Sequence, residues 1–290
     1  MRRGVALLIT LIMLSALSVL LLKSYDISGK FIEDEKDLKL IYQANRIFLD
    51  SKPLLKSVLK DVNSSEAFDF LFSKPFPVVG KNFNLTFQFY PVENSININS
   101  LLSGKTVNKD IYNIIEDILI SYNVSDTDFF LKLLLDTIDE DNKERVYGSE
   151  IAAEDKFFSN SKIYSKKHLK KIMDYYYKNR DDKNIYKVPW QRYINFNSNG
   201  IDINFASLDL IKFLLPNQDT TDYFKSKYYE NFTDLDIEKD REKILKKLKV
   251  KFDMDTVLAK ITYENFDKQI VLEFIYDIKK GTQKRIKYKF

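Results

Sequence analysis

The chain begins with MRRG (residues 1–4) and continues as VALLITLIMLSALSVLLL (residues 5–22), an apolar run without charge, glycine or proline. As a helix rising about 1.5 Å per residue, this run is about long enough to cross the roughly 30 Å hydrocarbon core of a bilayer. Arg2 and Arg3 precede it, and basic residues favour the cytoplasmic side. The stretch predicts a single-pass inner-membrane protein whose C-terminal domain, after Lys23, lies in the periplasm.

Several N-terminal signals contain such an apolar run. A secretory signal peptide ends in small residues of the A-x-A kind, whereas this run ends in three leucines and Lys23. A lipoprotein signal is excluded because the chain has no cysteine. Two interpretations stay open at this point. One is a plain membrane anchor. The other is a prepilin-like leader, cut between Gly4 and Val5 so that the apolar helix stays on the mature protein.

Composition excludes several classes of function. The formal net charge of the 290 residues is +4, and a nucleic-acid-binding protein usually shows a strong basic patch. The lack of cysteine removes disulfides and thiolate chemistry. The one histidine, His168, lies in the basic stretch SKKHLKK, where we expect a solvated surface residue. Because no nucleophile, phosphate loop or His–carboxylate arrangement is recognisable, we expect a protein that is not an enzyme.

The spacing of apolar residues predicts a mixed fold. Residues 33–58 repeat apolar side chains every three or four positions and predict a helix, with a kink or restart at Pro53. Residues 83–89 alternate as a half-buried strand does, and so do pieces of residues 250–290. Helical patterns fill most of the sequence between these strands. The order predicts an α+β fold with a large helical domain inserted between strands of an antiparallel sheet.

Two short passages form a weak internal repeat, ININ at residues 96–99 and IDIN at residues 201–204. A helical region follows each of them. An asparagine at the end of a short strand can cap or hold the next helix through its side chain. Turn-forming asparagines would explain each passage alone, but the recurrence indicates a repeat.

The segment from residue 136 to residue 155 is strongly acidic. Against Lys143 and Arg145 it holds eight acids: Asp136, Asp139, Glu140, Asp141, Glu144, Glu150, Glu154 and Asp155. Carboxylates at alternate positions followed by a later glutamate suit a hard cation such as Ca²⁺, which takes six to eight oxygen ligands. The spacing is not that of an EF-hand. A solvated acidic loop is the other interpretation, and the residues alone favour it.

The whole chain resembles the general secretion pathway protein K family, the K-type minor pseudopilins (GspK) of type II secretion systems. The matching stretches, in family order, are RGVALLITL at the prepilin junction, ININSL at 96–101, DTIDED at 136–141, GSE at 148–150 and IDINFAS at 201–207. The chain departs from the family pattern at three positions. Thr137 occupies a position where the family has tryptophan, Ile151 one where it has aspartate, and Phe205 one where it has threonine.

The resemblance implies a minor pseudopilin at the tip of a periplasmic pseudopilus, which nucleates or caps assembly and aids protein export across the outer membrane. Prepilin peptidase would process and methylate it, and the I- and J-type minor pseudopilins would be partners, with exported proteins as further ones. Ile9 at the fifth mature position fits, since this family lacks the usual glutamate there. The tip subunit of a competence pseudopilus for DNA uptake is the alternative, with no direct binding of nucleic acid expected.

The resemblance also implies site residues and boundaries. Calcium would be bound in the helical domain by Asp136, Asp139, Asp141 and Glu150. Partner contacts would use the N-terminal helix through Ile9, Leu38, Ile41 and Phe48. The expected boundaries are 1–4 for the leader, 5–61 for the N-terminal helix with its transmembrane part at 5–22, 62–98 for a pilin-like α/β part, 99–216 for the inserted helical domain, and 217–290 for a C-terminal helix and β-sheet part.

Overall fold

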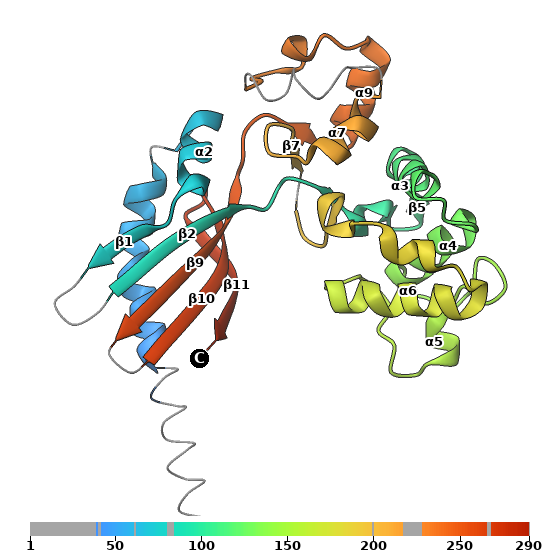
Figure 1. The fold of residues 1–290 in the computed structure, drawn as a ribbon, viewed down its shortest axis with the longest axis horizontal. Helices are drawn as coiled ribbons and strands as arrows, with labels where there is room; N and C mark the ends of the chain where they lie inside the picture. The colour runs from blue at the N-terminus through green and yellow to red at the C-terminus, as the bar shows by residue number, and fades with distance from the viewer. Residues whose placement is uncertain are drawn as a thin grey trace, which may run out of the picture.

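The computed structural model describes residues 39, 42–60, 62–79, 84–198, 200–216, 228–265 and 268–289. The predicted processing residues Gly4 and Val5 and the predicted partner residues Ile9, Leu38 and Ile41 lie outside these ranges. Within them, no helix is both long enough and apolar enough to span a membrane. Figure 1 shows an antiparallel sheet with helices on one side, and a larger, mainly helical part beyond one end of the sheet.

The N-terminal helix, described over residues 42–60, lies against the sheet through one apolar face. Its buried positions follow a spacing of three or four residues, as the sequence predicts: Ala44, Phe48, Ser51, Leu55 and Leu59. The ring of Phe48 meets Phe274 edge to face, with 5.2 Å between ring centroids. The helix continues without interruption through the exposed Pro53, so the expected restart is not observed.

The sheet has five strands in the order β1-β2-β9-β10-β11, and every neighbouring pair is antiparallel. Helix α2 (Ser65–Ser73) precedes it. The strands are β1 (Phe76–Val79), β2 (Asn84–Pro91), β9 (Thr256–Asn265), β10 (Lys268–Asp277) and β11 (Thr282–Lys289). Strands β2 and β9 are neighbours in the sheet although more than half of the chain separates them. The predicted α+β fold with a helical insertion between strands is therefore confirmed.

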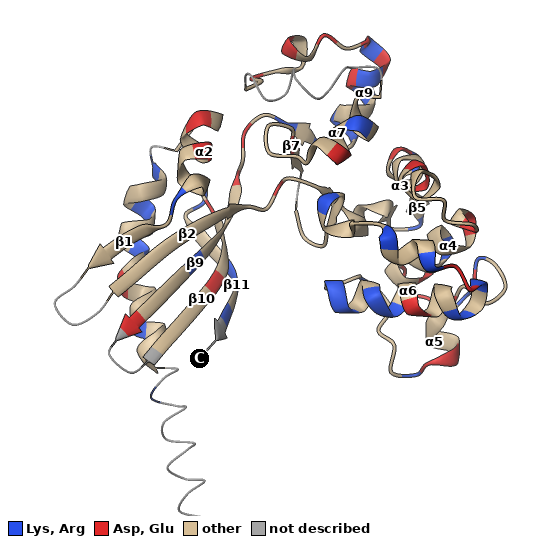
Figure 2. Cartoon of the chain, viewed as in Figure 1, with Lys and Arg blue, Asp and Glu red and all other residues tan. Residues whose placement is uncertain are grey.

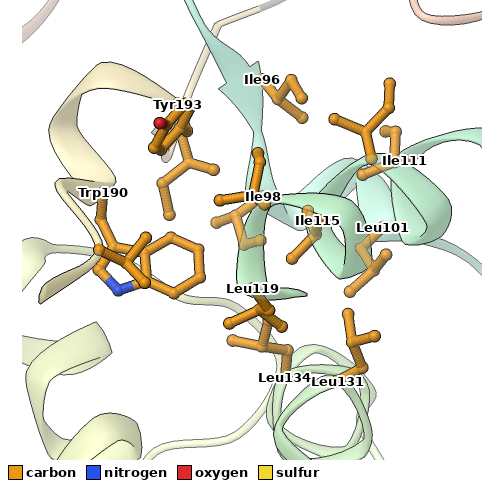
Figure 3. Close-up of a cluster of buried hydrophobic side chains, with 14 of the residues drawn as sticks. Ile96, Ile98, Leu101, Ile111, Ile115, Leu119, Leu131, Leu134, Trp190 and Tyr193 are labelled. Carbon is orange, nitrogen blue, oxygen red and sulfur yellow. The ribbon is translucent and has the colours of Figure 1, made fainter. Parts of the chain in front are cut away.

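The insertion carries its own hydrophobic core, separate from the core under the sheet. In Figure 3, Ile98 lies between Trp190 on one side and Ile115 on the other. The helices around this core are α3 (Lys109–Ser121), α4 (Thr127–Ile138), α5 (Ile151–Glu154), α6 (Lys166–Arg180), α7 (Leu208–Leu214) and α9 (Lys239–Lys247). Shorter elements join them: the 3-10 turns η1 (Ile98–Leu101), η2 (Lys183–Lys187), η3 (Trp190–Arg192) and η4 (Phe232–Leu235), and the hairpin β4–β5 (Leu102–Ser103, Thr106–Val107). Leu245 of α9 and Val250 belong to this core, so the insertion extends past the expected boundary at residue 216.

The insertion consists of two units, and each is closed by a pair of short parallel strands. In the first unit β3 (Ile96–Asn97) pairs with β6 (Ile194–Asn195). In the second unit β7 (Ile201–Asp202) pairs with β8 (Val250–Lys251). The opening strands are the two passages that form the sequence repeat. The repeat is thus a repeat of architecture, in which helices lie between an opening strand and its parallel partner.

Equivalent asparagines, Asn99 and Asn204, each stabilise their own unit. The amide of Asn99 pairs with the backbone of Ile163, accepting from its N–H at 2.8 Å and donating to its carbonyl at 3.0 Å, and it also donates to the Phe196 carbonyl. Asn204 pairs in the same way with the backbone of Tyr229, at 2.8 and 3.0 Å. The prediction that these asparagines hold the next helix is therefore wrong for Asn99 and Asn204, because their amides bind backbone groups farther along the chain; Asn97 is the residue that caps η1.

Candidate cation site in the acidic loop

The acidic loop lies between α4 and α6 and folds back on the end of α4. Asp136 is fully buried on the last turn of α4, and Asp139 ends that helix. The Tyr175 hydroxyl of α6 donates to the Gly148 carbonyl at 3.1 Å and so fixes the middle of the loop. Asn160 closes the loop, because its amide donates to the Glu150 carboxylate at 2.8 Å. The loop is therefore a folded structure that brings distant acids together.

Arg145 binds two of the predicted calcium ligands. Its Nη1 donates to both the Asp136 and the Asp139 carboxylates. Its backbone N–H also donates to Asp136 Oδ2, at 3.0 Å, and this oxygen accepts from the Ser149 hydroxyl as well. A guanidinium group therefore lies where the acidic side chains of this loop converge.

Three buried oxygens around this cluster have no hydrogen-bond partner in the described part of the chain: Asp139 Oδ1, Glu150 Oε2 and Asn160 Oδ1. Glu150 is only 2% exposed, and its other oxygen accepts from the Ala152 N–H at 3.1 Å as the N-cap of α5. Burial raises the pKa of both Asp139 and Glu150, and their proximity to Asp136 raises the pKa of each further. Buried oxygens usually accept a hydrogen bond, so these three are polar groups that a positively charged ligand could bind.

The fourth predicted ligand is placed differently. Asp141 is exposed, and its Oδ1 accepts from the Lys143 N–H at 2.9 Å. Across the described ranges, no three His, Cys, Asp or Glu side chains are grouped closely enough to hold a metal ion as they stand. The structure thus joins Asp136 and Asp139 through Arg145, places Glu150 near enough for their charges to raise its pKa, and leaves Asp141 at the surface. Sequence reasoning missed the roles of Arg145 and Asn160, which no spacing rule signals.

Other predicted residues also have defined surroundings. Phe48, expected at a partner contact, is instead buried in the chain's own core. In the described part of the N-terminal helix, the exposed large apolar side chains are Tyr42, Leu49, Leu54 and Val58. His168, expected to be solvated, is half-buried against the rings of Phe158 and Tyr164, at 4.9 and 6.0 Å, and burial lowers its pKa. Basic and acidic residues are interspersed along the ribbon (Figure 2).

Comparison of structures finds a similar fold in a known complex. A chain of the crystal structure of the GspK-GspI-GspJ complex from the enterotoxigenic Escherichia coli type 2 secretion system superposes with a TM-score of 0.57, covering 90% of this chain and 99% of that chain at 12% sequence identity. The sequence itself matches no protein-family model and no curated protein. The chain therefore has a GspK-like fold at a low sequence identity.

Proposed function

We propose that a chain with this GspK-like fold is a minor pseudopilin of a type II secretion system and occupies the tip of its pseudopilus. The observation that carries the proposal is the two-unit helical insertion between β2 and β9, next to a sheet that covers the N-terminal helix. The likeness extends over 90% of this chain and so includes both parts. A bulky domain beyond the end of the sheet would leave no room for a further subunit above it, which suits a capping subunit.

The proposed partners are other minor pseudopilins, because the similar structure is a complex of three proteins, GspK, GspI and GspJ. The N-terminal helix is the proposed contact, through Ile9, Leu38 and Ile41 and through the exposed apolar residues of its outer face. Tyr42 is 75% and Leu49 58% exposed on this helix. Such side chains in a helix face are suited to helix–helix packing within a filament. The proposal places the protein in the inner membrane, with the sheet and the insertion in the periplasm.

Calcium binding in the acidic loop is part of the proposal. The support is that Asp139 and Glu150 each have a buried carboxylate oxygen without a partner among the described residues. Carboxylate oxygens are ligands that a hard cation such as Ca²⁺ takes. Asp136 and Asp141 would complete the set on rearrangement of the loop. Added calcium should then raise the melting temperature of the purified full-length protein, and Asp139→Ala should abolish the rise. An unchanged melting temperature of the unaltered protein would remove calcium from the proposal.

The test of the main proposal is the mass of the N-terminus of the protein isolated from membranes, in cells with and without prepilin peptidase. A chain that begins at Val5 only when the peptidase is present supports a pilin-like subunit. A chain that begins at Met1 in both, or is cut after the apolar run, refutes it. Deletion of the gene then separates the two systems, because a secretion subunit is needed for protein export and a competence subunit for DNA uptake.

A further inference from the structure

We propose that a groove beside α6 is a docking site for an acidic, extended segment of a partner protein, with an apolar side chain of that segment inside the groove. This α6 groove is a cavity of about 270 Å³ between α6 and the chain that runs from η2 through η3 to β6. None of its lining residues belongs to the acidic loop or to the described N-terminal helix. The inference therefore depends neither on calcium binding nor on the pseudopilin assignment.

The floor of the α6 groove is apolar. Helix α6 turns one face toward it, because its lining residues follow a helical spacing of three and four positions: Lys166, Leu169, Lys170 and Met173. Leu169 and Met173 are buried, and so are Val188, Trp190 and Ile194, which also line the groove. A pocket for a drug-sized ligand has roughly 300–1,000 Å³. At about 270 Å³, the α6 groove suits one or two amino-acid side chains.

The groove also contains an unused hydrogen-bond donor. Trp190 is 6% exposed, and its indole N–H has no acceptor among the described residues. Figure 3 shows this nitrogen at the outer edge of the cluster of apolar side chains. Most buried polar groups in folded proteins are hydrogen-bonded, and an unmade bond is costly. A carbonyl or carboxylate oxygen of a docked segment would give the indole N–H an acceptor.

Positive charge surrounds the entrance of the groove. The first two turns of α6 contain Lys166, Lys167, Lys170 and Lys171, and the first turn has no acid, although a helix N-terminus already favours negative charge. Blue segments mark this end of α6 in Figure 2. Lys170 pairs with Asp174 at 2.7 Å, whereas the exposed Lys166 makes no ion pair with any described residue. A ligand complementary to this groove therefore carries negative charge beside an apolar side chain.

The experiment is a fluorescence titration of the purified full-length protein. Trp190 is the reporter, because it is the single tryptophan of the chain and lines the groove. The probe is a pool of peptides, acetyl-Glu-Glu-X-X-Glu-Glu-amide, in which X is Leu, Met or Phe. Two matched pools test the two requirements, one with serine at both X positions and one with lysine in place of glutamate. We expect only the first pool to change the emission of Trp190 saturably.

The protein variants are Lys166→Gln and its matched control Lys167→Gln. Both substitutions remove one positive charge from the first turn of α6, but only Lys166 lines the groove. Both side chains are exposed, so neither change disturbs the core. We expect Lys166→Gln to weaken binding of the first pool about fivefold or more and Lys167→Gln by less than about twofold, because the attraction between charges falls with distance and is screened by salt.

Each result supports or overturns the docking site. An emission that stays unchanged with the first pool overturns it. Equal binding of the serine pool or the lysine pool overturns it as well, because one of the two requirements would then be unnecessary. Equal weakening by both substitutions would show that the peptides bind the basic helix as a whole, outside the groove. A loss confined to Lys166→Gln, with both matched pools inactive, supports the proposal.

Discussion

Replacing Asp202 by asparagine should stabilise the protein at alkaline pH and have a much smaller effect in acid. Asp202 lies in β7, where the insertion meets the sheet, and is 0% exposed. Its Oδ1 accepts from the Asn204 N–H at 3.0 Å, whereas Oδ2 has no partner among the described residues. Burial raises the pKa of this carboxyl from 3.8 to about 7. Between about pH 4 and pH 7, the folded protein therefore holds a proton on Asp202 that the unfolded chain has released.

The magnitude follows from this difference in pKa. Because the folded pKa lies above the unfolded one, the unfolded state loses its proton first, and stability falls as the pH rises from about 4 to about 7. Each unit of pKa difference corresponds to about 1.4 kcal/mol. Asparagine does not titrate, so its advantage over Asp202 should grow by about 3 kcal/mol between pH 5 and pH 8. Any constant cost of the new amide group cancels in this comparison.

The assay is urea unfolding followed by fluorescence of Trp190, the single tryptophan of the chain, which is buried in the core of the insertion. The free energy of unfolding of the unaltered protein and of Asp202→Asn is compared at pH 5 and pH 8. Asp50→Asn, an exposed acid on the N-terminal helix, serves as the control. A stability difference for Asp202→Asn that stays constant between the two pH values would refute the reasoning.

Three further predictions concern packing and polar contacts. Asn99→Ala and Asn204→Ala should each lower the free energy of unfolding, measured in urea, by about 2–4 kcal/mol, because each substitution leaves a backbone N–H and carbonyls unpaired. An effect at only one of the two positions would contradict their equivalence. In the same assay, Phe48→Ala should lower the free energy of unfolding by about 3–5 kcal/mol, because Phe48 is buried. Leu49→Ala should lower it by less than about 0.5 kcal/mol, because the Leu49 side chain is exposed. Phe205→Ala should make the junction more sensitive to limited proteolysis, because the ring bridges the insertion and α2; unchanged cleavage rates would argue against this bridge.

Periodic patterns made much of the fold predictable. The alternation of residues 83–89 foretold a strand whose Phe87 and Phe89 point into the core, and the helical spacing after residue 42 foretold the buried face of the N-terminal helix. The strands that close the two units have only two residues each, too few for any periodicity to be recognised. The pairing of β2 with β9 is likewise set by tertiary packing and has no local signal.

The candidate site was predicted in part. The density of acids marked the loop, and Asp136 and Asp139 share one partner there, Arg145, but the acids form no group of three that could hold a metal among the described residues. Counting charges, however, does not show which cation pairs with which acid, and Arg145 entered the sequence argument only as one of two basic residues. Phe205 is a different case, since it departs from the family pattern. Its ring packs against Phe72 of α2, with 5.3 Å between centroids, which gives the departure a structural reason.

The adjacency of β2 and β9 has a consequence for protein engineering. Pro91, the last residue of β2, pairs with Val257 near the start of β9, so the chain leaves and re-enters the sheet at one point. A tight turn joining these two strands would make the sheet an ordinary five-stranded meander. The helical part is therefore an insertion whose two ends lie side by side in the sheet, so its length places little demand on the geometry of the strands. The same position is therefore a suitable point at which to insert an engineered domain.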